Sequence, residues 1–132
     1  MAPGTGIYYI RCLKTRYFLT TKDIDSNARV TTSNSEEPAT FFVSENGGQF
    51  EIYERSTGFY VGAKMVGSPR DLQWQRAVYK WVIRDVAPGI YNVGNPTDNA
   101  YWFDNWKIGR WMTLSTGSSN DENNFEFVAA SV

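Results

Sequence analysis

Three stretches of the chain begin with a glycine and continue with the side-chain alternation of a β-strand. The glycines lie 42 and 41 residues apart, at Gly6, Gly48 and Gly89. A closing run led by an aromatic residue starts 35, 33 and 36 residues after its glycine, at Phe41, Trp81 and Phe125. Units of this size cannot bury their own apolar faces and must share a core with their copies. The sequence therefore predicts three units, residues 6–47, 48–88 and 89–132.

The length and composition favour one domain built from strands. A chain of 132 residues forms a single domain, residues 1–132, that buries about two-thirds of its unfolded surface. Hydrophobic residues make up 42% and aromatic residues 16%, while leucine is scarce. Aromatic residues are enriched in strands, whereas a helix bundle would be rich in leucine, alanine and glutamate.

Period-two alternation between turn-forming segments predicts four short strands in each unit. The expected strands are residues 7–12, 17–21, 28–32, 40–44, 50–55, 59–63, 71–74, 80–84, 90–94, 100–103, 111–115 and 125–128. Twelve strands in three pseudo-equivalent four-stranded units are the plan of an all-β fold, the β-trefoil. Three propeller blades would be too few to close a ring, and an immunoglobulin-like sandwich is the structural alternative.

Aligning the units on their glycines supports a pseudo-threefold core. The residues at position twelve are Phe18, Tyr60 and Tyr101, and those at position thirteen are Leu19, Val61 and Trp102. The residues at each position match in size and polarity. Such matching is what a core shared by three copies requires.

The opening segment resembles the first strand of the fungal ricin B-like lectins, including those that bind chitobiose-type glycans. Its sequence is Pro-Gly-x-Gly-x-Tyr-Tyr-Ile-Arg at residues 3–11. It also resembles the fungal β-trefoil protease inhibitors. The resemblance covers the whole chain as architecture. It implies a glycan ligand in the first case and a protease in the second.

The chain departs from the ricin type at the end of each unit. Ricin-type lectins close each unit with Gln-x-Trp, and the corresponding tripeptides here are residues 39–41, 79–81 and 123–125. The glutamine is absent from all three, and only Trp81 retains the tryptophan. The galactose sites that depend on this motif cannot be transferred, so a sugar site must be argued from other residues.

The third unit departs most from the repeat and supplies the candidate carbohydrate site. An aromatic ring can stack on the apolar face of a pyranose, while amide and carboxylate groups bind its hydroxyls. Tyr101 and Phe103 would share one face of a strand and Trp102 the other, so at least one ring should be exposed. The resemblance to chitobiose-binding lectins implies the first three of the following residues, and their chemistry adds the rest. The predicted site consists of Asn99, Tyr101, Trp102, Asp104, Asn105 and Trp106.

The alternative for these rings is packing in the core and the barrel floor, which is the usual place of aromatic strands in all-β proteins. Trp74 and Trp81 are expected to be structural. Trp81 occupies the closing position that Phe41 and Phe125 hold in the other units.

A protease inhibitor is the alternative function. Its reactive loop would be residues 64–71, in which Pro69 stiffens the backbone and Arg70 fills a trypsin-like pocket. Asp71 directly after Arg70 is a poor residue for that role, and an ordinary turn with a solvated arginine is the simpler interpretation. A module that binds another protein is a third class.

Composition argues against other classes of function. A net charge of −1 provides no field for nucleic acid, and the absence of histidine removes the commonest general base and metal ligand. We therefore expect no catalytic residue, metal or cofactor. The sequence shows no signal peptide and no membrane-spanning run, so we expect a cytoplasmic protein that does not insert into membranes. We also expect a monomer or a weak homodimer.

Overall fold

The structure, a computed structural model, describes residues 3–22, 24–64, 70–105 and 111–130. This part of the chain folds into twelve strands and one turn of 3₁₀ helix, Asp121–Asn123. The strands are β1 (Gly6–Cys12), β2 (Phe18–Leu19), β3 (Thr32–Ser33), β4 (Phe41–Asn46), β5 (Gln49–Glu54), β6 (Tyr60–Ala63), β7 (Arg70–Gln75), β8 (Val82–Ala87), β9 (Ile90–Gly94), β10 (Ala100–Asn105), β11 (Trp111–Thr116) and β12 (Phe125–Ala129). The prediction of an all-β fold with twelve short strands is confirmed.

Six strands close into a ring in the order β1, β4, β5, β8, β9, β12 and back to β1. The ring closes between β5 and β8 through a single bridge, in which Phe50 of β5 and Trp81, the residue directly before β8, exchange backbone hydrogen bonds of 2.7 and 2.8 Å. The first and last strands of each predicted unit therefore pair with each other and with the strands of the neighbouring units.

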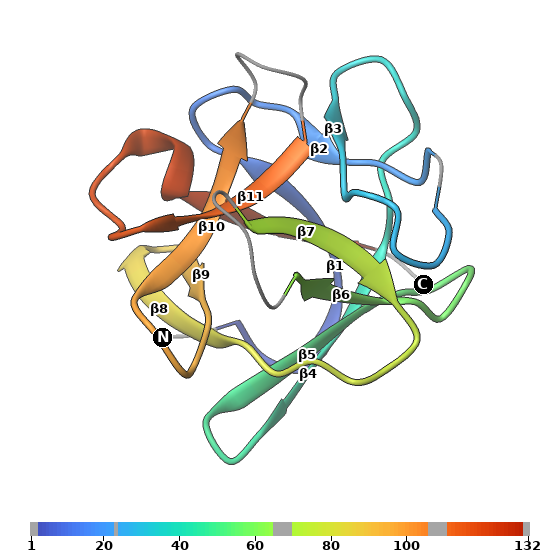
Figure 1. Ribbon diagram of the computed structural model, residues 1–132. Helices are drawn as coiled ribbons and strands as arrows, with labels where there is room; N and C mark the ends of the chain where they lie inside the picture. The colour runs from blue at the N-terminus through green and yellow to red at the C-terminus, as the bar shows by residue number, and fades with distance from the viewer. Residues whose placement is uncertain (1–2, 23, 65–69, 106–110, 131–132) are drawn as a thin grey trace.

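The other six strands pair as β2–β3, β6–β7 and β10–β11. Figure 1 shows β10 and β11 lying together, with β7 beside β11. The three pairs are linked through Leu72 of β7, Met112 of β11 and Val30, which lies two residues before β3. The amide of Val30 donates to the carbonyl of Leu72 over 3.1 Å, and the amide of Met112 donates to the carbonyl of Val30 over 2.8 Å. All three side chains are fully buried.

The core lies inside the ring and under these hairpins. The closing residues Phe41, Trp81 and Phe125 are fully buried, and so is Trp74. The structural role predicted for Trp74 and Trp81 is therefore confirmed.

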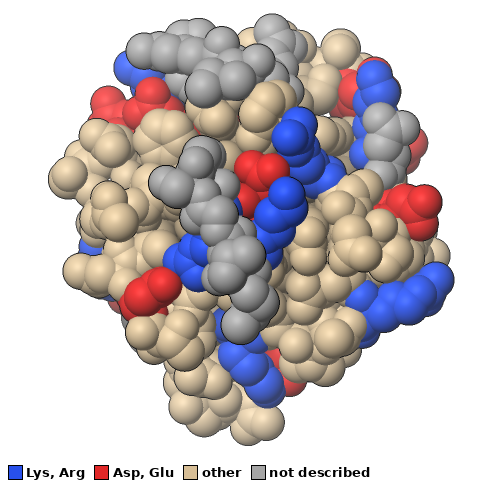
Figure 2. Space-filling model, in the orientation of Figure 1, with Lys and Arg blue, Asp and Glu red and all other residues tan. Residues whose placement is uncertain are grey.

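Charged side chains of both signs are mixed on the face of the molecule shown in Figure 2. On the face shown in Figure 2, blue and red residues are scattered among a tan majority. This distribution agrees with the small net charge of −1.

Candidate functional site

Trp102, which the sequence placed in the sugar site, lies in the core. Its exposed fraction is 0%, and its ring meets those of Trp81 and Phe125 edge-on at centroid distances of 5.5 Å. It occupies the position of Leu19 and Val61 in the other units, which are buried as well. A ring enclosed in this way cannot stack on a sugar, so the prediction of a sugar-binding Trp102 is corrected.

Asp104 is also buried rather than presented to a ligand. Its two carboxylate oxygens accept hydrogen bonds from the hydroxyl of Thr15, over 2.7 Å, and of Thr32, over 3.1 Å. The strand alternation that points Trp102 inward also points Asp104 inward. Asp104 therefore ties β10 to the first unit, and its place in the predicted site is corrected too.

The remaining members of the third-unit cluster stay a prediction. Asn99 is exposed before β10, and Asn105 is half-buried at its end. Tyr101 is half-buried, with the guanidinium of Arg84 at 5.0 Å from its ring centroid. Trp106 lies outside the described residues. Asn99 and Tyr101 thus offer an amide and a ring to solvent, but one ring face lies against a cation.

Arg70 is not a projecting specificity residue. It begins β7, and its guanidinium lies 2.8 Å from the carboxylate of Asp98 with only 19% of its side chain exposed. An inhibitor's specificity residue must project freely into the protease. The structure corrects this assignment of Arg70, while residues 65–69 of the proposed loop lie outside the described residues.

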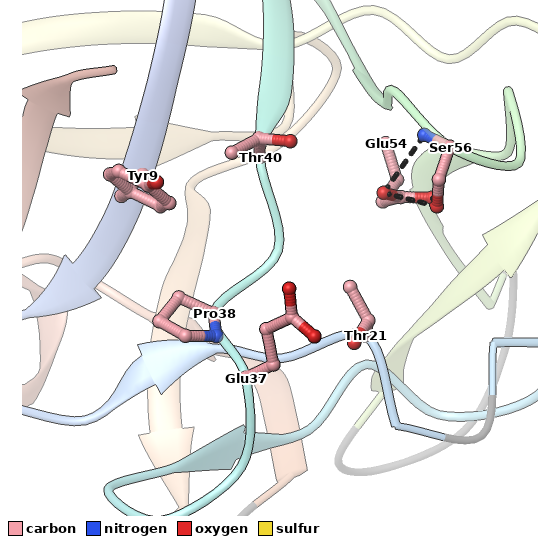
Figure 3. A pocket seen from close by; sticks show the side chains of 7 residues that line it. All are labelled: Tyr9, Thr21, Glu37, Pro38, Thr40, Glu54 and Ser56. Carbon is pink, nitrogen blue, oxygen red and sulfur yellow. Dashed lines mark hydrogen bonds between the residues drawn. The ribbon is translucent and has the colours of Figure 1, made fainter. Parts of the chain in front are cut away.

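The larger of two described hollows lies where the first unit meets the second. This cavity, which we call the Tyr9 pocket, has a volume of about 410 Å³. Its size falls within the range of roughly 300–1,000 Å³ that is usual for small-molecule sites. The lining residues, shown in Figure 3, are Tyr9, Thr21, Glu37, Pro38, Thr40, Glu54 and Ser56.

Hydrogen bonds to backbone carbonyls link distant segments in the walls of the Tyr9 pocket. The carbonyl of Glu37 accepts from the amide of Thr21 over 3.3 Å and from the hydroxyl of Thr20 over 3.0 Å. The carbonyl of Thr40 accepts from the amide of Arg55 over 3.0 Å. The pocket is therefore formed before any ligand binds.

Glu54 stabilises one wall rather than serving a ligand. Its carboxylate accepts hydrogen bonds from the amides and hydroxyls of Ser56 and Thr57, at 2.8 to 3.0 Å. Burial alone would raise the pKa of Glu54, but these hydrogen bonds outweigh burial and hold the pKa below its ordinary value. Glu54 is thus ionised at neutral pH and fixes the turn after β5.

The groups left to face a ligand are one ring, two hydroxyls and one carboxylate. Tyr9 is half-buried, and its ring meets Phe18 edge-on at 6.1 Å. Thr21 and Thr40 contribute hydroxyls, and the exposed carboxylate of Glu37 points toward the centre of the group in Figure 3. None of the described residues that line this pocket is a lysine or an arginine. The arrangement suits a neutral ligand with an apolar face and several hydroxyl donors.

The Tyr9 pocket could not be predicted directly from the sequence. Its residues come from four segments between positions 9 and 56, and each segment alone reads as strand or turn. An acidic pair before the closing strand was the one available signal. Glu36 and Glu37 are both exposed, as residues of a solvated loop would be, and only the structure shows that Glu37 lines a cavity.

The strand arrangement matches that of β-trefoil proteins. The BEL β-trefoil superposes with a TM-score of 0.77 at 11% identity, over 98% of this chain and 97% of that one. The ricin B-like lectin of Macrolepiota procera, solved with lactose, gives a TM-score of 0.82 at 13% identity, over 98% and 99% of the two chains. The Rhizoctonia solani agglutinin gives 0.84 at 11% identity, over 98% and 99%. The resemblance to ricin B-like lectins is confirmed as a likeness of fold.

No family model and no curated protein matches the sequence. Within the described residues, no three or more acidic or cysteine side chains gather as a metal site, and no helix could cross a membrane.

Proposed function

We propose that this protein is a non-catalytic carbohydrate-binding protein and that the Tyr9 pocket holds the glycan. The observation that carries this proposal is the preformed pocket that is lined by the aromatic residue Tyr9, the two threonines Thr21 and Thr40, and Glu37. The likeness in fold to two solved lectins supports the same class of function.

The chemistry of the pocket narrows the ligand. A pyranose can lay its apolar C–H face against Tyr9 while its hydroxyls donate to Glu37 and exchange hydrogen bonds with Thr21 and Thr40. Because Glu37 and Glu54 both carry negative charge, a sugar with a carboxylate or sulfate is disfavoured here. A neutral glycan fits best, and the resemblance to chitobiose-binding lectins suggests one that contains N-acetylglucosamine.

The proposal includes the division of the chain into three units that the sequence predicts. We take the three sets of strands to be pseudo-equivalent units, because the same pairings recur in each set. A role in fungal defence and a cytoplasmic location accompany the lectin proposal as predictions. Asn99 and Tyr101 form a second possible contact surface for the same class of ligand.

A glycan array followed by calorimetry tests the function and its location. Glu37→Gln removes the charged acceptor from an exposed side chain, so it should preserve the fold and weaken binding of the best glycan about tenfold. Glu36→Gln is the matched control. Glu36 is the exposed neighbour, lies outside the pocket and faces Lys22 at 3.8 Å.

Three results would count against the proposal. Binding of no glycan by the folded protein would contradict the function. Unchanged affinity in Glu37→Gln would contradict the Tyr9 pocket as its location. Loss of binding in Tyr101→Ala alone would move the site to the third-unit surface.

A further inference from the structure

A second, smaller pocket lies where the second unit meets the third. This cavity, which we call the Tyr79 pocket, has a volume of about 240 Å³. It is lined by Arg70, Tyr79, Lys80, Asn95, Pro96 and Thr97. It shares no residue with the Tyr9 pocket.

The two pockets occupy corresponding places in the repeat. Glu54 and Asn95 each follow their unit glycine by six residues, and each accepts a 3.0 Å hydrogen bond from the amide two residues further on, in Ser56 and Thr97. The hydroxyl of Thr97 also donates to Asn95, as that of Ser56 does to Glu54. The same turn therefore builds one wall of both pockets.

The opposite wall carries different chemistry in the two pockets. Glu37 and Tyr79 each lie 31 residues after their unit glycine, and Pro38 and Lys80 each lie 32 residues after it. An acid and a proline in the first pocket are thus replaced by a phenol and an ammonium group in the second.

The Tyr79 hydroxyl has a hydrogen left to donate. It accepts a hydrogen bond from the side-chain amide of Asn95 over 2.8 Å, so its acceptor role is in use. Burial is the main cause that raises the pKa of Tyr79 above its ordinary value. The phenol therefore stays protonated at neutral pH. Its ring is held against Trp81 at a centroid distance of 4.6 Å.

Two cations complete the lining. One guanidinium nitrogen of Arg70 pairs with Asp98, and the Lys80 ammonium pairs with Glu51. A guanidinium has five N–H donors and an ammonium three, so these single pairs leave further donors on both groups. The partner acids Asp98 and Glu51 do not line the cavity.

We propose that the Tyr79 pocket binds an anionic substituent of a sugar, a carboxylate or a sulfate, through Tyr79, Arg70 and Lys80. All three present donors, which suits an acceptor-rich anion, whereas the Tyr9 pocket presents a carboxylate. The small volume suits a substituent rather than a whole glycan. The sugar part of this inference rests on the function proposed above, while the anion site does not.

The proposal predicts that replacing Asp98 increases the affinity of the Tyr79 pocket for anions. Its carboxylate holds Arg70 at 2.8 Å, and its side chain is 46% exposed. An incoming anion must compete with this carboxylate for the guanidinium. Asp98→Asn should therefore tighten anion binding about fivefold, and Asp121→Asn, an exposed acid outside this pocket, should not.

An amide NMR titration tests the site with four probes: glucuronic acid, glucose 6-sulfate, glucose and inorganic sulfate. We expect both acidic sugars to shift the Asn95 side-chain amide and the Thr97 amide saturably, and glucose to leave them unmoved. Tyr79→Phe and Lys80→Gln should each weaken binding about three- to tenfold. Lys22→Gln is the control, since Lys22 lies outside the pocket.

Each outcome of the titration either supports the anion site or overturns it. Shifts with only one acidic sugar assign the site to that anion, and equal binding of inorganic sulfate reduces it to an anion site without sugar recognition. No shift with any anion, in either the unchanged protein or Asp98→Asn, overturns it. Failure of the lectin proposal is separable, because it would be seen as unmoved Tyr9-pocket amides with neutral glycans.

Discussion

For Trp102, the neighbouring residues predict an exposed ring, whereas the alignment of the three units predicts a buried one. Read by itself, residues 99–106 look like an aromatic surface with polar groups between the rings. Read against the other units, Trp102 stands where Leu19 and Val61 stand, and all three are buried. The alignment of the three units predicts that Trp102 is buried, because a position that stays apolar in three copies is a core position.

The burial of Trp102 predicts a large loss of stability on truncation. Trp102→Ala should lower the free energy of unfolding by about 3–5 kcal/mol, because it leaves a cavity beside Trp81 and Phe125. Tyr101→Ala, at the half-buried neighbour, should cost less than half as much. Urea unfolding of both variants measures this difference, and equal costs would contradict the assignment of Trp102 to the core.

Glu54 predicts a dependence of stability on pH. Its folded-state pKa lies below the ordinary value of about 4.5. The hydrogen-bonded carboxylate therefore adds stability above the unfolded-state pKa, and this stability is lost as the pH falls through the folded-state pKa. Unfolding measured from pH 7 to pH 3 should show a smaller loss in Glu54→Gln than in the unchanged protein. Parallel curves would contradict the role of these hydrogen bonds.

Strand positions could be predicted from the alternation of side chains along the sequence. Where the structure differs from this prediction, the difference has a physical origin. Residues 28–32 were expected to form a strand, but β3 begins at Thr32. Arg29 and Thr31 instead form single bridges to Gln73 and Trp111 of the other hairpins. This pairing involves segments that are 40 or more residues away in the sequence. The local alternation of side chains does not predict such contacts.

The close contact of β9 with β10 depends on a glycine. A Cβ added at Gly94 would lie 2.7 Å from the ring of Tyr101. Gly94→Ala should therefore displace that ring and cost about 1–3 kcal/mol in unfolding free energy. Gly4→Ala is the control, because nothing lies within 4 Å of its added Cβ. Equal stability of the two variants would contradict this packing.

The fold of the whole molecule could be predicted from the sequence, whereas the proposed binding pocket could not. Twelve strands and a shared core follow from a repeat that the sequence displays directly. The Tyr9 pocket does not, because it needs side chains of the first unit to meet Glu54 and Ser56 of the second. Only the closure of the ring brings these segments together.

The two pockets should bind independently. They share no lining residue and lie at different junctions between units. Saturating the Tyr79 pocket with glucose 6-sulfate should therefore change the affinity for the neutral glycan less than about twofold. Calorimetry with and without the sulfated sugar measures this, and strong mutual weakening would show that both ligands use one site.

A crystal structure of the complex with the best-binding neutral glycan tests the central claim most directly. We predict a pyranose against the Tyr9 ring, with its hydroxyls hydrogen-bonded to Glu37 and to Thr21 or Thr40. A glycan bound elsewhere on the protein, with the Tyr9 pocket holding only water, would contradict it.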